Sequence, residues 1–67
     1  MFKKDEIKEY YITEEIVGIY NDRENKSITV EINIVDKSFR YYVENKRDII
    51  LTTDSLDEAI KRFNEAL

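Results

Sequence analysis

Hydrophobic and polar residues alternate in the middle of the chain, which is the pattern of a β-strand with one buried face. The apolar positions of the first alternating run are Ile28, Val30, Ile32 and Ile34. A second run, from Phe39 to Val43, alternates in the same way. Because Asp36 and Lys37 stand between the runs, the sequence predicts a hairpin with a two-residue turn. The pairs in this register are Ile34 with Phe39, Ile32 with Tyr41, and Val30 with Val43, all on one face.

Toward its C-terminus the chain changes to helical spacing. The apolar positions there are Leu56, Ala59, Ile60, Phe63, Ala66 and Leu67. Ser55 stands where an N-cap is expected, and Glu58 three residues later completes a capping-box pattern. The sequence therefore predicts a C-terminal amphipathic helix with one apolar stripe.

Two further strands are expected from weaker patterns. Residues Ile16 to Tyr20 present apolar groups to both faces of a strand, and Gly18 within them indicates a bulge or a close approach of another element. Ile49 to Leu51 forms a short fourth strand ahead of the helix. The stretch from Lys3 to Ile12 fits either a short helix or, in its last residues, an extension of the first strand.

Together these elements predict a single small α+β domain over residues 1–67, because so short a chain has no room for two cores. The expected architecture is a three- to four-stranded antiparallel β-meander with the C-terminal helix packed on one face. In one of the two alternatives the N-terminal segment is a short helix. The predicted core, packed against the helix stripe, is Ile28, Val30, Ile32, Ile34, Phe39, Tyr41, Val43, Ile49 and Leu51.

The composition removes several kinds of chemistry. A hydrophobic content of 42% argues against a disordered chain. The absence of cysteine and histidine excludes a disulfide-stapled domain and the usual zinc, haem and thiol sites. One glycine is too few for a phosphate-binding loop, and each serine has an ordinary place in a turn or cap. We therefore expect no enzymatic activity, no catalytic residues, no cofactor and no metal site.

The ends of the chain bear on its location. No stretch approaches the ~20 apolar residues that a membrane span needs. In the opening residues, 1–6, two lysines are followed by two acidic residues, where a signal peptide would continue with apolar ones. A cytoplasmic protein is therefore expected, and a Pro-free composition rich in Ile, Lys and Asn favours a bacterial or phage origin.

The net charge of −4 is unevenly placed. Residues 1–36 hold five basic and nine acidic side chains, whereas residues 37–67 hold six of each. An acidic array on a rigid domain can imitate the phosphates of DNA and block an enzyme that acts on nucleic acid. Inhibition of a larger protein is therefore one function that this charge distribution favours.

A helix on one face of the sheet leaves apolar groups on the other. The expected members are Tyr42, Ile50, and either Val17 with Ile19 or Ile16 with Tyr20. Such a patch often marks an interface. Three occupants remain open: the N-terminal segment through Phe2, Ile7 and either Tyr10 or Tyr11, a second copy of the chain, or another protein. The candidate interaction residues on this face are Val17, Ile19, Glu31, Asn33, Arg40, Tyr42 and Ile50.

The sequence therefore predicts a non-catalytic protein–protein interaction module, acting as a homodimer or on another protein. The alternative is a nucleic-acid-binding domain that uses the exposed sheet face. Arg40 and Tyr42 share that face, where a guanidinium can meet phosphate and a ring can stack on a base. A net charge of −4 weighs against this alternative, because it supplies no broad positive field.

Overall fold

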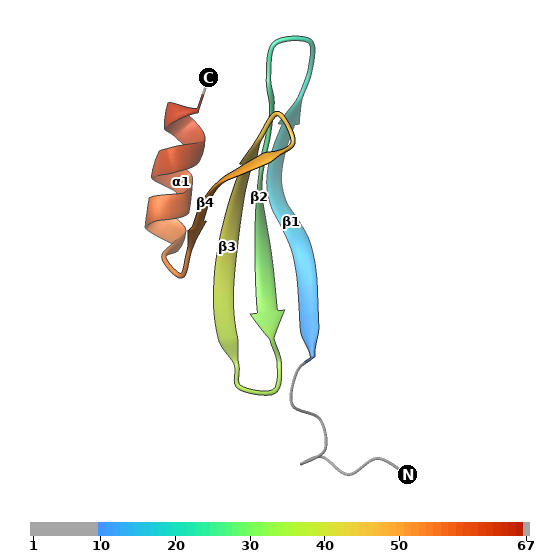
Figure 1. Ribbon diagram of the computed structural model, residues 1–67, viewed down its shortest axis with the longest axis vertical. Coiled ribbons are helices and arrows are strands. Elements are labelled where there is room, and N and C mark those ends of the chain that lie inside the picture. Colours follow the sequence, from blue (N-terminus) through green and yellow to red (C-terminus); the bar gives the residue numbers. More distant parts are fainter. Residues whose placement is uncertain (1–9, 67) are drawn as a thin grey trace.

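The computed structural model describes residues 10–66, which form one antiparallel sheet and one helix (Figure 1). The elements are β1 (Tyr11–Tyr20), β2 (Asn25–Asn33), β3 (Ser38–Asn45), β4 (Asp48–Thr53) and α1 (Leu56–Glu65). The strand order is β1-β2-β3-β4, so every strand pairs with its neighbour in sequence. The predicted meander with a C-terminal helix is therefore confirmed, with four strands.

Strand β1 is longer than the predicted strand from Ile16 to Tyr20. It begins at Tyr11 and pairs with β2 over almost its whole length. Of the two alternatives for the stretch from Lys3 to Ile12, the extension of the first strand is thus correct for Tyr11 and Ile12. Residues 1–9, which include Phe2 and Ile7, lie outside the described residues.

The hairpin between β2 and β3 differs from its predicted register by two residues. Asn33 pairs with Ser38, so the loop has four residues, 34–37, in place of the two-residue turn that we expected. Polar groups close this loop: Asp36 Oδ1 accepts bonds from the Ser38 hydroxyl at 2.6 Å and backbone N–H at 3.0 Å, which lower the pKa of Asp36. Lys37 turns the chain with a φ of 61°. The alternation fixed which face each residue occupies but not how many residues the loop takes.

The pairs observed in this hairpin are Ile32 with Phe39, Val30 with Tyr41, and Ile28 with Val43. A shift of two residues keeps every side chain on its predicted face, because side chains in a strand alternate with a period of two. The two-residue difference in register therefore changes the cross-strand partner of each residue but not the face on which its side chain lies.

Both edge strands contain a β-bulge. In β1 the register shifts between Glu15 and Val17, which leaves Ile16 as the extra residue. In β4 the residues paired with Val43 and Glu44 are Leu51 and Ile49, so Ile50 is extra. A bulge can bring consecutive side chains to one face. Ile16 and Val17 both line a groove beside α1, and Ile50 and Leu51 both pack against the core.

The core is smaller than the sequence indicated. Its buried centre is Ile28, Val43, Ala59 and Phe63, with Ile19, Tyr41, Ile50 and Leu51 partly buried around it. Three residues predicted for the core are instead about half exposed: Ile34 (46%), Phe39 (53%) and Ile49 (59%). Ile49 pairs with Glu44 and so lies on the sheet face away from α1. The other two lie beyond the reach of the helix.

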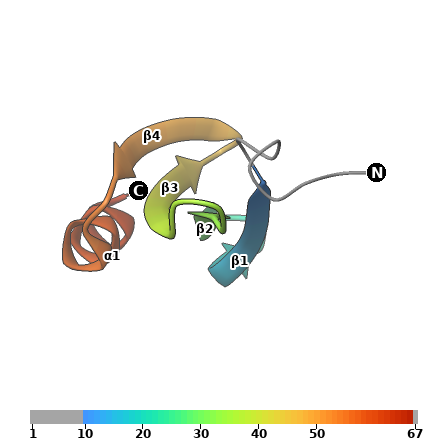
Figure 2. The same ribbon diagram turned by 90° about the horizontal axis from the view of Figure 1, so that it is seen from below.

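The length of the helix explains this shortfall. Ten residues of β-strand extend about 33 Å, whereas ten residues of α-helix extend about 15 Å. Helix α1 packs closely against β2, β3 and β4, whereas of the described strands β1 has no Cα within 8 Å of a Cα in the helix. Figures 1 and 2 show the helix beside the end of the sheet farthest from the β2–β3 loop, with β1 on the opposite side. About half of the helix-side face therefore has no helix over it.

The predicted N-cap of α1 is confirmed. Ser55 Oγ accepts a bond from the Glu58 backbone N–H at 3.2 Å. The second half of the capping box differs, because the Glu58 carboxylate accepts from the Thr53 hydroxyl at 2.9 Å. Thr53 Oγ1 in turn accepts the Ser55 N–H at 3.0 Å. Thr53 thus links the end of β4 to the first turn of the helix.

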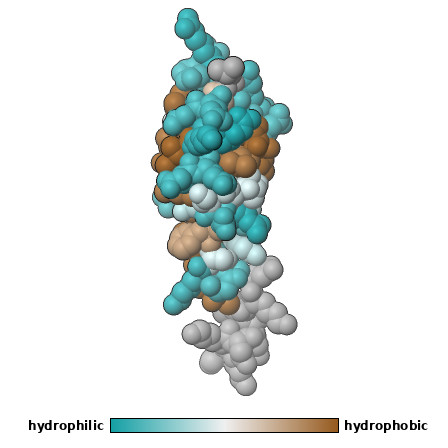
Figure 3. All heavy atoms as spheres, turned by 90° about the vertical axis from the view of Figure 1, so that its left-hand side faces the viewer, coloured by the Kyte–Doolittle hydropathy of each residue, from teal (hydrophilic) through white to brown (hydrophobic). Residues whose placement is uncertain are grey.

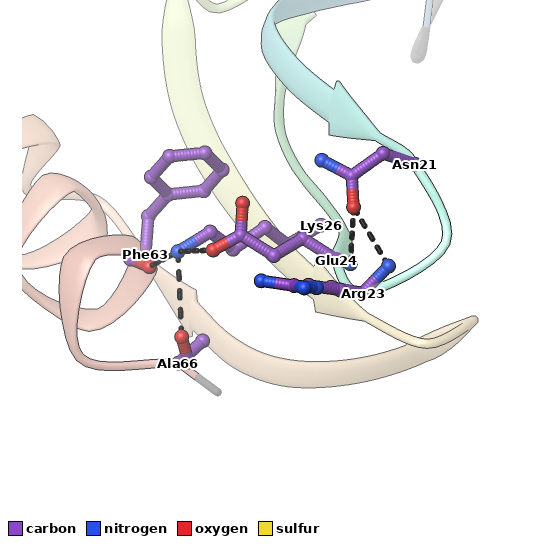
Figure 4. A network of polar contacts seen from close by, with 6 residues as sticks. All are labelled: Asn21, Arg23, Glu24, Lys26, Phe63 and Ala66. Atoms are coloured by element: carbon purple, nitrogen blue, oxygen red, sulfur yellow. Dashed lines mark hydrogen bonds and ion pairs between the residues drawn. The ribbon is translucent and has the colours of Figure 1, made fainter.

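A buried lysine holds the other end of α1. Lys26 Nζ donates to the backbone carbonyls of Phe63 at 2.9 Å and Ala66 at 3.3 Å (Figure 4). It lies 4.6 Å from the centre of the Phe63 ring and 3.9 Å from the Glu24 carboxylate. A cation at a helix C-terminus meets the negative end of the helix dipole. Lys26, opposite Ile19 on β1, therefore ties the last helical turn to β2.

Candidate protein-docking surface

A groove runs between α1 and β1, where the helix does not reach the edge strand. We call "the groove" the surface lined by Ile16, Val17, Ile28, Leu56, Ile60, Phe63 and Asn64. Its volume is about 380 Å³. Six of its seven lining residues are apolar, and four of those six are 39–47% exposed. Figure 3 shows hydrophobic side chains on both sides of the hydrophilic outer face of the helix.

Next to the groove lies the part of the helix-side face that α1 does not cover. We call it "the open half". It contains two cross-strand rows of side chains: Ile12, Ile32 and Phe39 in one, and Glu14, Val30, Tyr41 and Thr53 in the other. These residues share a face with buried Ile28 and Val43 because of the strand alternation. Ile12 is 45% exposed, so an apolar surface continues from the groove along the sheet.

The far face of the sheet is mainly polar, which corrects the expected apolar patch there. Its rows include Tyr11, Thr13, Glu15, Glu31, Arg40, Tyr42, Glu44 and Ile49. The Tyr42 hydroxyl donates to Glu31 at 3.2 Å. Tyr42 also hydrogen-bonds with Arg40 and raises the pKa of the guanidinium. Arg40 pairs with Glu31 across the strands, and Glu15 and Glu44 lie farther along the same face.

The structure divides the seven candidate interaction residues between the two faces. Glu31, Asn33, Arg40 and Tyr42 lie on the far face, and Asn33 is buried with its side chain accepting the Val35 N–H at 3.0 Å. Val17, Ile19 and Ile50 lie on the helix side: Val17 lines the groove, and the other two pack against the core.

The two bulges cause this division. A regular strand would have alternated Ile16 and Val17, and likewise Ile50 and Leu51, between faces. Bulge positions carry no clear sequence signal here. Gly18 was the expected marker, but the bulge in β1 lies before it, at Ile16.

The sequence patterns predicted Phe39, Leu56 and Ile60 for the core, whereas the structure exposes all three. Ile12 and Ile16 were not among the candidate site residues. A comparison of helix length with strand length would have found the uncovered region. It needs only the rise per residue of each element.

Two side chains of β1 lie close to Gly18 on the far face. The Tyr20 hydroxyl donates a hydrogen bond to the Glu15 carboxylate across the glycine. A Cβ at position 18 would lie 2.6 Å from Tyr20 Cε2 and 2.7 Å from Glu15 Oε2, too close for either contact. The bond to Glu15 raises the pKa of Tyr20, because it stabilises the protonated phenol beside a negative charge. Both side chains belong to β1 itself, so the element that was predicted to approach Gly18 is not what lies beside it.

This contact predicts a change in tyrosine ionisation. In Glu15→Gln we expect the pKa of Tyr20 to fall toward its ordinary value of 10.0, as measured by NMR titration of the labelled tyrosine ring. Because the pKa is raised in the folded chain, the stabilisation is complete below pH 10 and is lost as the pH rises above it. Glu44→Gln is the matched control, since Glu44 contributes least to the shift. An unchanged Tyr20 pKa in Glu15→Gln would show that the bond does not form.

Residues 10–66 contain neither a cluster of metal-ligating side chains nor a membrane-spanning helix. Between residues 10 and 66 no three acidic side chains converge to hold a metal ion. In the same range no helix is both long and apolar enough to cross a membrane.

The fold and surface define a small antiparallel α+β domain with a partly uncovered sheet. Comparisons with protein families, with curated proteins and with solved structures found no significant match. Function therefore has to be inferred from the chain's own residues and geometry.

Proposed function

We propose that this chain is a non-catalytic protein–protein interaction module whose docking surface is the groove together with the open half. One observation carries the proposal: six large apolar side chains, each 39–53% exposed, lie on the helix side of the sheet or on α1 where it borders the groove. They are Ile12, Ile16, Val17, Phe39, Leu56 and Ile60. Large exposed apolar patches are uncommon on monomers and mark interaction sites.

The size of this surface suits a specific interface. A large residue that is about half exposed leaves on the order of 100 Å² in water. Six such residues, with the partly buried ones between them, approach the ~800 Å² per partner that a standard interface buries. Covering one of these side chains completely is worth up to about 1.5–3 kcal/mol. A partner therefore finds enough apolar surface here to bind with useful affinity.

The alternative, a nucleic-acid-binding face built on Arg40 and Tyr42, has weaker support. Phosphate binding requires an excess of positive charge. On the far face Arg40 pairs with Glu31, Glu15 and Glu44 lie on the same face, and the Tyr42 hydroxyl already donates to Glu31. A patch of this composition repels phosphate more than it attracts it.

Neighbouring residues on opposite faces of β1 provide the test. Ile12 belongs to the open half, and Thr13 pairs with Glu31 on the far face; both are exposed. We expect immobilised wild-type chain and Thr13→Lys to capture the same protein from an extract of the native host, and Ile12→Lys to lose it. Circular dichroism checks that both variants fold. Equal capture by Ile12→Lys would contradict the proposal, as would capture lost equally in Thr13→Lys.

A further inference from the structure

The space above the open half has the dimensions of one short helix. Strand β1 exceeds α1 by about 18 Å, which is the length of about three helical turns. Strand β4 ends at Thr53, opposite Tyr41, so the sheet beyond this point has only three strands. The outer two of these are about 10 Å apart, close to the diameter of a helix. A second helix placed there would continue the layer that α1 begins.

The charges around the open half favour an incoming helix that carries basic side chains. Glu14 lies on β1 at one end of the row that contains Val30 and Tyr41, and Thr53 at the other end donates to the Glu58 carboxylate. Two carboxylates therefore flank the apolar surface, and neither row contains a lysine or arginine. Basic side chains on an occupant would meet these carboxylates.

The same charges disfavour a second copy of the chain. A symmetric dimer packs the same patch against itself. Glu14 and Glu58 of one copy would then approach Glu14 and Glu58 of the other, and the two rows supply no positive charge to offset them. Like charges brought together across an interface oppose association.

We propose that the open half receives an amphipathic α-helix of another protein, with basic residues flanking its apolar stripe. This rests on the proposed function, because it names the partner for the same surface. The apolar side chains of the incoming helix, spaced three and four residues apart, pack on Ile12, Ile32 and Phe39. Its lysines or arginines lie against Glu14 and Glu58.

The test uses the full-length chain and two synthetic peptides of about 14 residues, long enough to be helical when bound. The first carries leucine at helical spacing, lysine beside the leucines and alanine elsewhere; the second has glutamate in place of lysine. Binding is followed by NMR shifts of the side-chain methyl and ring signals, because each side chain points to one face of the sheet. We expect shifts centred on Ile12, Ile32 and Phe39, and no shifts of similar size at Thr13 or Tyr42 on the far face.

The expected preference is large enough to measure. An exposed ion pair strengthens binding by about two- to fivefold, so exchanging two attractions for two repulsions weakens it about tenfold or more. Glu14→Gln should weaken binding of the lysine peptide by about two- to fivefold. Glu44→Gln, the matched far-face control, should leave it unchanged. Equal binding of both peptides, or shifts centred on the far face, would overturn the proposal.

Two other outcomes would also overturn it, and they separate its failure from that of the proposed function. If sedimentation shows a dimer that Ile12→Lys dissociates and Thr13→Lys does not, the occupant is a second copy and the interaction module stands. If the chain is monomeric and binds the lysine peptide only after Phe2→Ser and Ile7→Ser, the chain's own first residues occupy the surface. In that case both proposals fail.

Discussion

Phe63→Ala is expected to unfold most of the protein at 25 °C. The Phe63 side chain is 7% exposed, packs with Ile28 and Val43, and lies under the Lys26 ammonium. Removing a buried phenylalanine ring costs about 3–5 kcal/mol. A domain of this size has a total stability of only about 3–5 kcal/mol. The loss is therefore comparable to the whole free energy of unfolding.

Urea denaturation followed by far-ultraviolet circular dichroism measures this effect. Phe63→Leu refills most of the volume and should cost about 1–2 kcal/mol, which keeps the transition observable if the alanine variant has none. Ile60→Ala is the matched control on the same helix, because Ile60 is 43% exposed and loses little buried contact. A Phe63→Ala variant as stable as Ile60→Ala would contradict the core described above.

Lys26→Met is expected to have the second-largest effect on stability, a loss of about 1–3 kcal/mol. Methionine keeps the aliphatic stem but removes the donor to the Phe63 and Ala66 carbonyls, and Ala66 is itself buried. A buried acceptor left without a donor carries the full cost of its desolvation. Lys26→Met also removes the unfavourable burial of the ammonium charge, which stabilises the variant. The expected loss of stability therefore lies in the lower part of this range.

Lys61→Met is the control for this substitution, since Lys61 is exposed on α1 and should change stability by no more than about 0.5 kcal/mol. Amide hydrogen exchange adds a local measurement. In Lys26→Met the amides in the last turn of α1, whose carbonyls Lys26 binds, should exchange faster than in the wild type, whereas the Glu58 amide, which Ser55 still caps, should change less. If Lys26→Met were as stable as the wild type or more stable, the desolvation of the ammonium would outweigh its hydrogen bonds to the helix carbonyls.

The sequence predicted the elements of this fold well because each has a local cause. The alternation from Ile28 to Val43 and the stripe from Leu56 to Phe63 each follow the period of one kind of secondary structure. The N-cap at Ser55 depends on residues within one turn of it. The hairpin register needed the geometry of the 34–37 loop, where Asp36 bonds to Ser38, and no glycine marks that turn.

The candidate site was predicted less well, because it depends on distances across the molecule. Strand alternation placed Glu31, Arg40 and Tyr42 correctly on the far face. Bulges at Ile16 and Ile50 turned neighbouring apolar residues toward the helix. No local sequence pattern predicted these bulges. Phe39 looked like a core residue until the helix proved too short to cover it. Apolar surface was thus expected on the wrong side of the sheet.

The accessibility of isoleucine methyl groups tests the central claim most directly. In the full-length chain, labelled at its isoleucines, a neutral gadolinium chelate broadens the methyl signals that solvent reaches. Ile12 (45% exposed) should be broadened strongly, Ile60 (43%) similarly, and Ile28 (1%) hardly at all. Protection of Ile12 to the level of Ile28 in the isolated monomer would show that the open half is already covered, and would contradict a surface left free for a partner.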